Sequence, residues 1–139
     1  MKCIIKWNKI LNTTLIGITD SKNIITMNSN KNEYSSPRPM EIILLGAGGC
    51  TTYDIITILK KNNQNIISLK LLINSKRSKK IPKVFININF FFKIYGININ
   101  KNLIESAINV SHKKYCSAII MLNKTAKISH NFKIKRIKY

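Results

Sequence analysis

MEIILLGAGGCTTYDIITIL, residues 40–59, is the longest apolar stretch of this 139-residue chain. Within it, Gly46-Ala47-Gly48-Gly49 contributes three glycines, and each glycine costs a helix roughly 1 kcal/mol relative to alanine. We therefore expect another backbone, or a substrate, to approach the chain closely at this point. Cys50 follows the glycines directly, so a thiol stands beside the surface that they open.

The apolar stretch is predicted to form a helix from about Met40 to Asn62. Ser35-Ser36-Pro37-Arg38-Pro39 precedes it and supplies capping serines and a proline suited to the first turn. Glu41, Asp54 and the three glycines interrupt the run of about 20 apolar residues that a membrane span requires. We expect a buried helix of a globular protein, and no membrane partner.

Alternating apolar residues predict strands on both sides of this helix. Before it, three short strands form an antiparallel meander: Lys2–Trp7, Thr13–Ile18 and Ile24–Met27. After it come a strand that buries Ile67, Leu69, Leu71 and Ile73, and a longer strand that buries Val84, Ile86, Ile88, Phe90, Phe92 and Ile94. The longer strand is about twice the usual length, so we expect it to extend beyond a minimal domain or to serve a dimer.

The remaining chain predicts two helical pieces and a last strand. After Gly96, one helix face carries Leu103, Ile104, Ala107, Ile108 and Ser111. A third helical piece covers about Lys114 to Asn123 and carries Cys116, and the last strand runs from Ala126 to Ile137. The order βββ-α-ββ-α-α-β is that of an α+β protein. A chain of this length fits one domain, residues 1–139, with its own core.

Composition excludes a disordered chain, because 45% of the residues are hydrophobic and 21% are charged. The net charge of +19 would suit a nucleic acid or an anionic membrane. However, the basic residues are mainly lysines spread over every segment, and the abundant Lys, Asn and Ile share A/T-rich codons. We therefore favour a solvated basic surface over a nucleic-acid partner, which stays a remote alternative.

Cys3, Cys50 and Cys116 are an odd number of cysteines without a CxxC pair. This pattern disfavours a secreted disulfide scaffold and a zinc site. The N-terminal residues also lack the apolar core and cleavage site of a signal peptide. We expect a cytoplasmic protein with reduced thiols.

Two settings are possible for Cys50. If Gly48-Gly49 break the helix, Cys50 begins a new segment, and the free amides there would lower the pKa of its thiol. If the helix is continuous, the thiol faces the glycine groove without that help. Asp54, four residues on, would raise the thiol pKa unless a cation holds it. An inert core cysteine is the alternative to a reactive one.

His112 and Cys116 are four residues apart, so on a helix they could meet on one face. No third metal ligand is evident near them in the sequence, and His130 is expected on a distant strand. We expect no metal, and a solvated or locally bonded histidine.

Several motifs together resemble one known family. They are Ser36-Pro37-Arg38-Pro39-Met40-Glu41, the run from Gly48-Gly49-Cys50 to Lys60, and the distant Lys114-Tyr115-Cys116-Ser117. The chain resembles the OsmC/Ohr family, most closely its YhfA-like branch, over about residues 2 to 135. The resemblance implies an OsmC-like fold and an intertwined homodimer, in which the long central helices pair and two active sites lie at the interface.

The family's chemistry is the thiol-dependent reduction of hydroperoxides, organic ones especially. The resemblance assigns the peroxidatic role to Cys50 and the resolving role to Cys116, with an external dithiol as reductant and no cofactor or metal. Family members with this activity carry a glutamate ten residues before the cysteine, where this chain has Met40, and an arginine from the N-terminal region. Here Arg38 is the first arginine in the chain, so it is the candidate activating cation. Lys22 could supply a positive charge but lacks the planar guanidinium group of arginine.

Glu41 does not replace the missing glutamate. It lies nine residues before Cys50, which puts the two on opposite sides of a continuous helix. Two functions therefore stay open: a thiol peroxidase that cycles Cys50 and Cys116, and a non-catalytic protein that binds a small ligand in the dimer groove.

Overall fold

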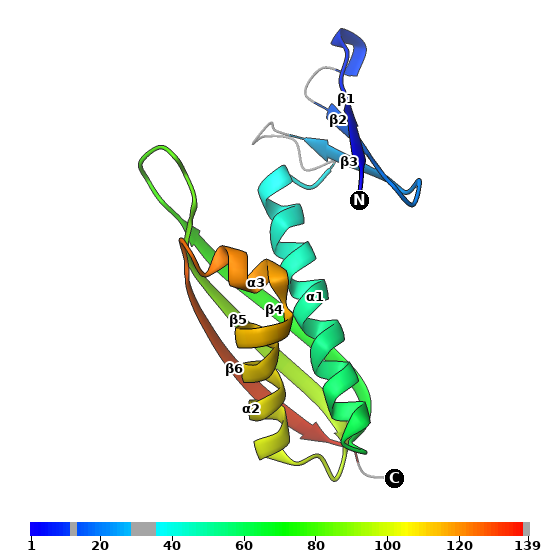
Figure 1. Cartoon of the computed structure of the whole chain (residues 1–139), viewed down its shortest axis with the longest axis vertical. Helices are drawn as coiled ribbons and strands as arrows, with labels where there is room; N and C mark the ends of the chain where they lie inside the picture. The colour runs from blue at the N-terminus through cyan, green and yellow to red at the C-terminus, as the bar shows by residue number, and fades with distance from the viewer. Residues whose placement is uncertain (12–13, 29–35, 138–139) are drawn as a thin grey trace. The chain divides into compact units, whose positions relative to one another are not determined.

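The computed structural model of the chain describes residues 1–11, 14–28 and 36–137. Thr13 and Ser35, which the sequence places at a strand start and before the helix, lie outside these residues. The chain divides into two compact units, Met1–Leu45 and Gly46–Tyr139, and each is described by itself (Figure 1). The mixed order of strands and helices confirms the predicted α+β class.

The first unit contains the predicted meander. Strands β1 (Cys3–Lys6), β2 (Thr14–Thr19) and β3 (Ile24–Asn28) pair antiparallel in the order β1-β2-β3, with the short 3₁₀ helix η1 (Lys9–Leu11) after β1. Lys22 has a φ of 64° in the turn between β2 and β3. Its backbone N–H donates to the Thr19 carbonyl at 2.9 Å, which closes that turn.

Helix α1 (Pro39–Lys61) runs without a break through the glycines. At its start, the Arg38 backbone N–H donates to Glu41 Oε2 at 2.8 Å, so this carboxylate caps the first turn. A Cβ added at Gly48 would lie 2.6 Å from Ile73 Cδ1 on the neighbouring strand. The close approach at Gly48 is therefore to side chains, not to the expected backbone or substrate, and among the described residues a Cβ at Gly46 or Gly49 would meet nothing within 4 Å.

One side of α1 is buried in the second unit, through Ala47, Gly48, Thr51, Ile55 and Leu59. By length and composition alone the helix could cross a membrane, with a mean hydropathy of 1.7 over its most apolar window. That observation is weak evidence, since core helices of soluble proteins share it. Only 28% of the window is buried within this chain, so the predicted burial holds for one side of the helix.

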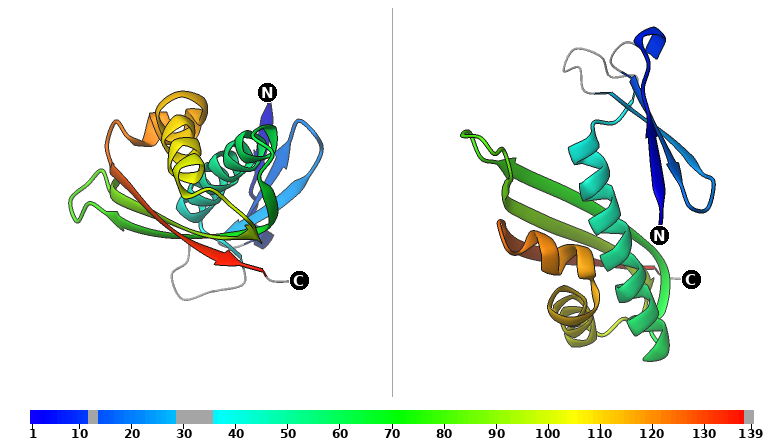
Figure 2. Two further views of the ribbon diagram at one scale, coloured as in Figure 1. Left: turned by 90° about the horizontal axis from the view of Figure 1, so that it is seen from below. Right: turned by 45° about the horizontal axis from the view of Figure 1, so that its top comes forward.

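The second unit is a three-stranded sheet covered on one face by helices (Figure 2). Strands β4 (Asn65–Arg77) and β5 (Phe85–Ile97) are antiparallel, and β6 (Lys127–Arg136) adds parallel to β5. A parallel pair needs a crossover. Here α2 (Lys101–Val110), the π-helical turn η2 (Ser111–Tyr115) and α3 (Ser117–Leu122) provide it.

The covered face of β5 carries the core. Ile88, Phe90, Phe92 and Ile94 have no exposed surface, as their alternation predicts. At both ends of the strand pair, however, the predicted alternation is wrong. Register shifts between Ile66 and Ser68 and between Lys76 and Arg77 insert an extra residue. Ile67 is consequently 52% exposed, and Phe85 is buried in place of Val84 and Ile86.

The opposite face of this sheet is basic. Lys70, Lys93 and Lys133 lie in register across the three strands. The Lys93 Nζ stands 5.8 Å from the centroid of the Phe91 ring. Like charges that face one another across strands repel, so this row of lysines is held by the packing of the other face.

Candidate functional site

Cys50 lies in the middle of α1, one residue beyond the glycines, and is half-buried. Because the helix is continuous, Cys50 does not stand at a helix N-terminus. Of the two settings that the sequence allowed, the structure has the one without help from free amides. Any activation of this thiol must come from neighbouring side chains.

Cys116 has an extended backbone between η2 and α3, with φ −76° and ψ 95°. The sequence analysis placed it inside a helical piece from about Lys114 to Asn123, which is wrong at this residue, because η2 ends at Tyr115 and α3 begins at Ser117. The Cys116 N–H donates to the Ser111 carbonyl at 2.8 Å. Its side chain is fully buried, with Sγ 3.9 Å from the Ala47 carbonyl oxygen.

The structure brings the two predicted cysteines together. Cys50 Sγ, Cys116 Sγ and a carboxylate oxygen of Asp54 all lie within 4.8 Å of one another. Cys50 and Asp54 are one helical turn apart on α1, and Cys116 reaches them from a segment more than sixty residues away. We call these three residues the thiol cluster.

The two thiols differ in their surroundings. Burial raises the pKa of the Cys116 thiol to about 12, and its hydrogen bond with Cys50 and the nearby Cys50 and Asp54 charges act in the same direction. Cys116 is therefore protonated at neutral pH. Cys50, which keeps solvent contact, is the thiol that a dissolved reactant can reach first.

Two buried hydroxyls hold the carboxylate of the thiol cluster. The Ser111 hydroxyl donates to Asp54 Oδ2 at 2.9 Å, and it also lies 2.9 Å from Thr51 Oγ1. A serine has one hydroxyl proton, so Thr51 donates to Ser111. The sequence analysis considered only a cation as a partner that could hold Asp54, and it missed both hydroxyls. The available signal was a serine on the apolar face of the predicted second helix.

Arg38, the candidate activating cation, lies in the first unit, and Cys50 in the second. The Arg38 guanidinium pairs with Glu41 Oε1 at 2.7 Å, and this hydrogen bond lowers the pKa of Glu41. Lys22 and the exposed Cys3 also belong to the first unit. The activating role of Arg38 stays a prediction.

His112 and His130 form a second cluster, which we call the histidine cluster. The ring centroids of His112 and His130 are 5.4 Å apart, and the His112 ring also meets Phe90 edge-on at 5.2 Å. His130 Nε2 lies 3.1 Å from Glu105 Oε1. The expectation of a distant His130 is therefore wrong, because the parallel register sets His130 beside Phe90.

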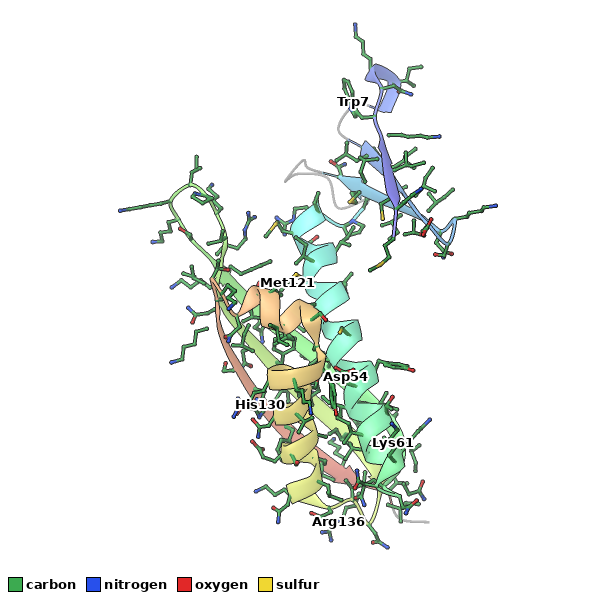
Figure 3. All side chains as sticks on the ribbon, viewed as in Figure 1. Trp7, Asp54, Lys61, Met121, His130 and Arg136 are labelled. Carbon is green, nitrogen blue, oxygen red and sulfur yellow. The ribbon has the colours of Figure 1, made fainter. Side chains whose placement is uncertain are left out.

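His112 is not the solvated or locally bonded residue that the sequence suggested. Its Nε2 is buried and has no hydrogen-bond partner among the residues that the structure describes. Burial, with a smaller effect from the charge of His130, lowers the pKa of His112 to about 4. The ring is neutral at physiological pH. Figure 3 labels Asp54 on α1 and His130 on β6, one residue from each cluster.

A pocket of about 280 Å³ opens beside the thiol cluster. Asp54 belongs to its wall, together with Tyr53, Lys61 and Tyr115. The wall thus combines aromatic surface with both signs of charge. A small molecule held there would lie next to the carboxylate of the thiol cluster.

Comparison with known proteins identifies a family for this architecture. The family model described as "OsmC-like protein" matches residues 30–131. Protein YhfA of Escherichia coli K12 is 32% identical over 134 residues, which cover 96% of this chain and 98% of that protein.

Solved structures show the same fold. An OsmC-like protein from Mycoplasma pneumoniae has a TM-score of 0.82 at 19% identity, over 96% of this chain and 95% of that one. The organic hydroperoxide resistance protein OhrB of Bacillus subtilis has a TM-score of 0.64 at 11% identity, over 95% of this chain and 96% of that one.

Proposed function

This chain belongs to the OsmC-like protein family, and from that premise we propose that it is a cytoplasmic thiol peroxidase that reduces hydroperoxides, organic ones in particular. The observation that carries the proposal is the approach of the Cys50 and Cys116 sulfurs within 4.8 Å. A family protein with this fold is named for organic hydroperoxide resistance. We also propose that residues 1–139 act together as one domain.

The reaction begins at Cys50. Its thiolate attacks the terminal oxygen of a hydroperoxide, the O–O bond breaks, and the alkoxide takes up a proton and leaves as an alcohol. Cys50 is now a sulfenic acid. The Cys116 sulfur attacks that sulfur, a disulfide forms and water leaves. An external dithiol then returns two electrons and two protons, which restores both thiols.

The unequal burial of the thiols supports this order of roles. Cys50 can meet a reactant, whereas Cys116 has a raised pKa and no exposed surface, which protects the resolving thiol from direct oxidation. Met40 occupies the position of the family's activating glutamate, and Asp54 helps to raise the pKa of the Cys116 thiol. We therefore propose a slow enzyme, with Arg38 as the activating cation.

A homodimer is part of the proposal. Gly46, Gly49 and Tyr53 share one face of α1 and are exposed in the single chain, with Tyr53 at 73%. A second copy of α1 packed there would cover this apolar face. Sedimentation of the wild-type protein should show a dimer, and Gly49→Lys, whose Cβ would meet none of the described residues within 4 Å, should give monomers. A monomeric wild type at micromolar concentration contradicts the dimer.

The test of the reaction uses a near-stoichiometric amount of cumene hydroperoxide on the fully reduced protein. Peptide mass mapping should find a Cys50–Cys116 disulfide and one alcohol per disulfide. Cys50→Ser should consume no peroxide, while Cys3→Ser, the matched control, should behave as wild type. Peroxide consumption that is equal in Cys50→Ser and wild type would refute the proposal.

A second candidate function rests on the pocket beside Asp54. A non-catalytic protein would bind a small ligand there, with Tyr53 and Tyr115 as apolar walls and Lys61 as a cation for an acidic group. In that case no disulfide forms with peroxide, and Tyr115→Ala removes ligand binding while Cys50→Ser leaves it intact. The disulfide map thus separates the two functions.

A further inference from the structure

The thiol cluster combines donor atoms that a transition metal prefers. It offers two sulfurs and one carboxylate oxygen, all within 4.8 Å of one another. Zinc binds thiolate at about 2.3 Å and carboxylate at about 2.0–2.2 Å. Tetrahedral angles then put neighbouring donor atoms roughly 3.5–3.8 Å apart. Side-chain rotations that move each donor atom by about an ångström would bring all three within bonding distance of one ion.

The backbone already suits such a site. Cys50 and Asp54 are four residues apart on a continuous helix, which places both on one face, as in helical metal motifs. Cys116 comes from the extended segment before α3. The Ser111 hydroxyl fixes the Asp54 carboxylate through Oδ2, and outer hydrogen bonds of this kind orient the ligands of protein metal sites.

A disulfide cycle explains the two sulfurs but not the carboxylate. The carboxylate oxygen of Asp54 nevertheless lies within 4.8 Å of both sulfurs. A divalent cation accounts for the carboxylate as well, because all three groups bind such an ion in their deprotonated form. The sequence analysis expected no metal, because it found no third ligand for the pair of His112 and Cys116. The donor set in the structure omits His112 and joins Cys116 to Cys50 and Asp54 of α1.

We propose that Cys50, Asp54 and Cys116 bind one thiophilic divalent cation, Zn²⁺, per chain, with a fourth position open to water or a small ligand. Binding displaces the thiol protons that remain. Zinc then holds both sulfurs as thiolates, so metal and disulfide exclude each other. Oxidation of the loaded pair by a hydroperoxide consumes two protons, forms the disulfide, and releases an alcohol, water and Zn²⁺.

The test begins with direct binding. Reduced, metal-free protein is titrated with Co²⁺, whose thiolate charge-transfer and visible ligand-field bands report sulfur ligation and tetrahedral geometry. One equivalent per chain should bind, and Zn²⁺ should displace it. Cys50→Ser, Cys116→Ser and Asp54→Asn should each abolish or change these bands. Cys3→Ser and Glu105→Gln are controls that should keep them.

Two further measurements guard against misfolded variants. Zn²⁺ should protect Cys50 and Cys116, but not Cys3, from alkylation in the wild-type protein, as read by peptide mass. Ser111→Ala should weaken Zn²⁺ affinity roughly 10–100-fold without loss of a ligand. Alkylation of Cys50 and Cys116 unchanged by Zn²⁺, or Co²⁺ spectra without thiolate bands, would overturn the site.

The metal site does not rest on the proposed peroxidase. A chain that binds Zn²⁺ and forms no disulfide with peroxide keeps the metal site and loses the enzyme. A chain that forms the disulfide and binds no metal does the reverse. The disulfide is sought after peroxide treatment, whereas the metal is sought in the Co²⁺ spectrum of the reduced protein, so each can fail alone.

Discussion

Ser111 and His112 are neighbours at the start of η2, yet their side chains enter two different clusters. The Ser111 hydroxyl hydrogen-bonds to Thr51 and to Asp54 of the thiol cluster. His112 enters the histidine cluster, where its buried Nε2 has no partner among the described residues. Around the thiol cluster, buried polar groups are stabilised by hydrogen bonds to one another. In the histidine cluster, the buried His112 ring is tolerated because it stays neutral.

The largest expected effect is chemical and belongs to the thiol cluster. Cys50→Ser should reduce peroxide consumption by several orders of magnitude, because the attacking sulfur is gone. Since Cys50 and Cys116 act as a unit, the double variant with Cys116→Ser should be no worse than Cys50→Ser alone. Peroxide loss followed by a colorimetric assay checks this. An additive loss in the double variant would contradict a shared cycle.

The next effect tests whether pairing is what stabilises the thiol cluster. Ser111→Ala should lower the free energy of unfolding by about 1–3 kcal/mol, since the Thr51 hydroxyl is then buried without its partner. Urea denaturation measures the change. Adding Thr51→Val removes that orphaned hydroxyl and should recover part of the loss. A double variant as unstable as the sum of both single variants would argue against this cause.

The histidine cluster predicts a pH dependence. The pKa of His112 is about 4 in the folded chain and 6.5 ordinarily, so as the pH falls below 6.5 the unfolded chain takes up the proton first. The contribution of His112 to stability is complete above pH 6.5 and is lost as the pH falls to about 4. After allowance for solvent screening of a partly exposed ring, the loss is about 1–2 kcal/mol.

His112→Leu is the variant that tests this pH dependence. Denaturation at a series of pH values should show a shallower loss of stability on the acid side than in wild type. His130→Asn should keep most of the wild-type loss, because burial is the larger cause of the shift. If wild type and His112→Leu lose the same free energy of unfolding as the pH falls, another group controls the acid sensitivity.

The smallest expected effect is at the edge of the histidine cluster. Glu105 is half exposed where it meets His130, so Glu105→Gln should change stability by about 0–1 kcal/mol. High salt should reduce even this difference. A loss well above that range would show that the contact between Glu105 and His130 is less solvated than the exposed carboxylate implies.

The order of elements could be predicted from sequence because each element has its own signal. Alternation marked the strands, and the long apolar run marked α1. The exceptions, Ile67 and Ile86, arise at register shifts, where two residues of one strand oppose one of its partner. Alternation within a single strand carries no information about such pairing.

The site was predictable only in part. Cys50 and Cys116 came from motifs that resemble a family, and the structure brings them together. The meeting of His112 with His130 depends instead on the parallel register of β5 and β6, which sets Phe90 opposite His130. The hydroxyl pair of Thr51 and Ser111 depends on how α1 packs against the end of α2. The spacing of residues along the sequence does not reveal either of these two contacts.

The parallel addition of β6 to β5 also has a consequence for biosynthesis. β6 leaves the ribosome last of the three strands, some thirty residues after β5, so the edge of β5 waits uncovered while the crossover helices form. An uncovered edge can recruit a strand from another nascent chain. Lys93 puts a charge on that strand, and charged residues on an open edge strand disfavour such pairing and the aggregation that follows.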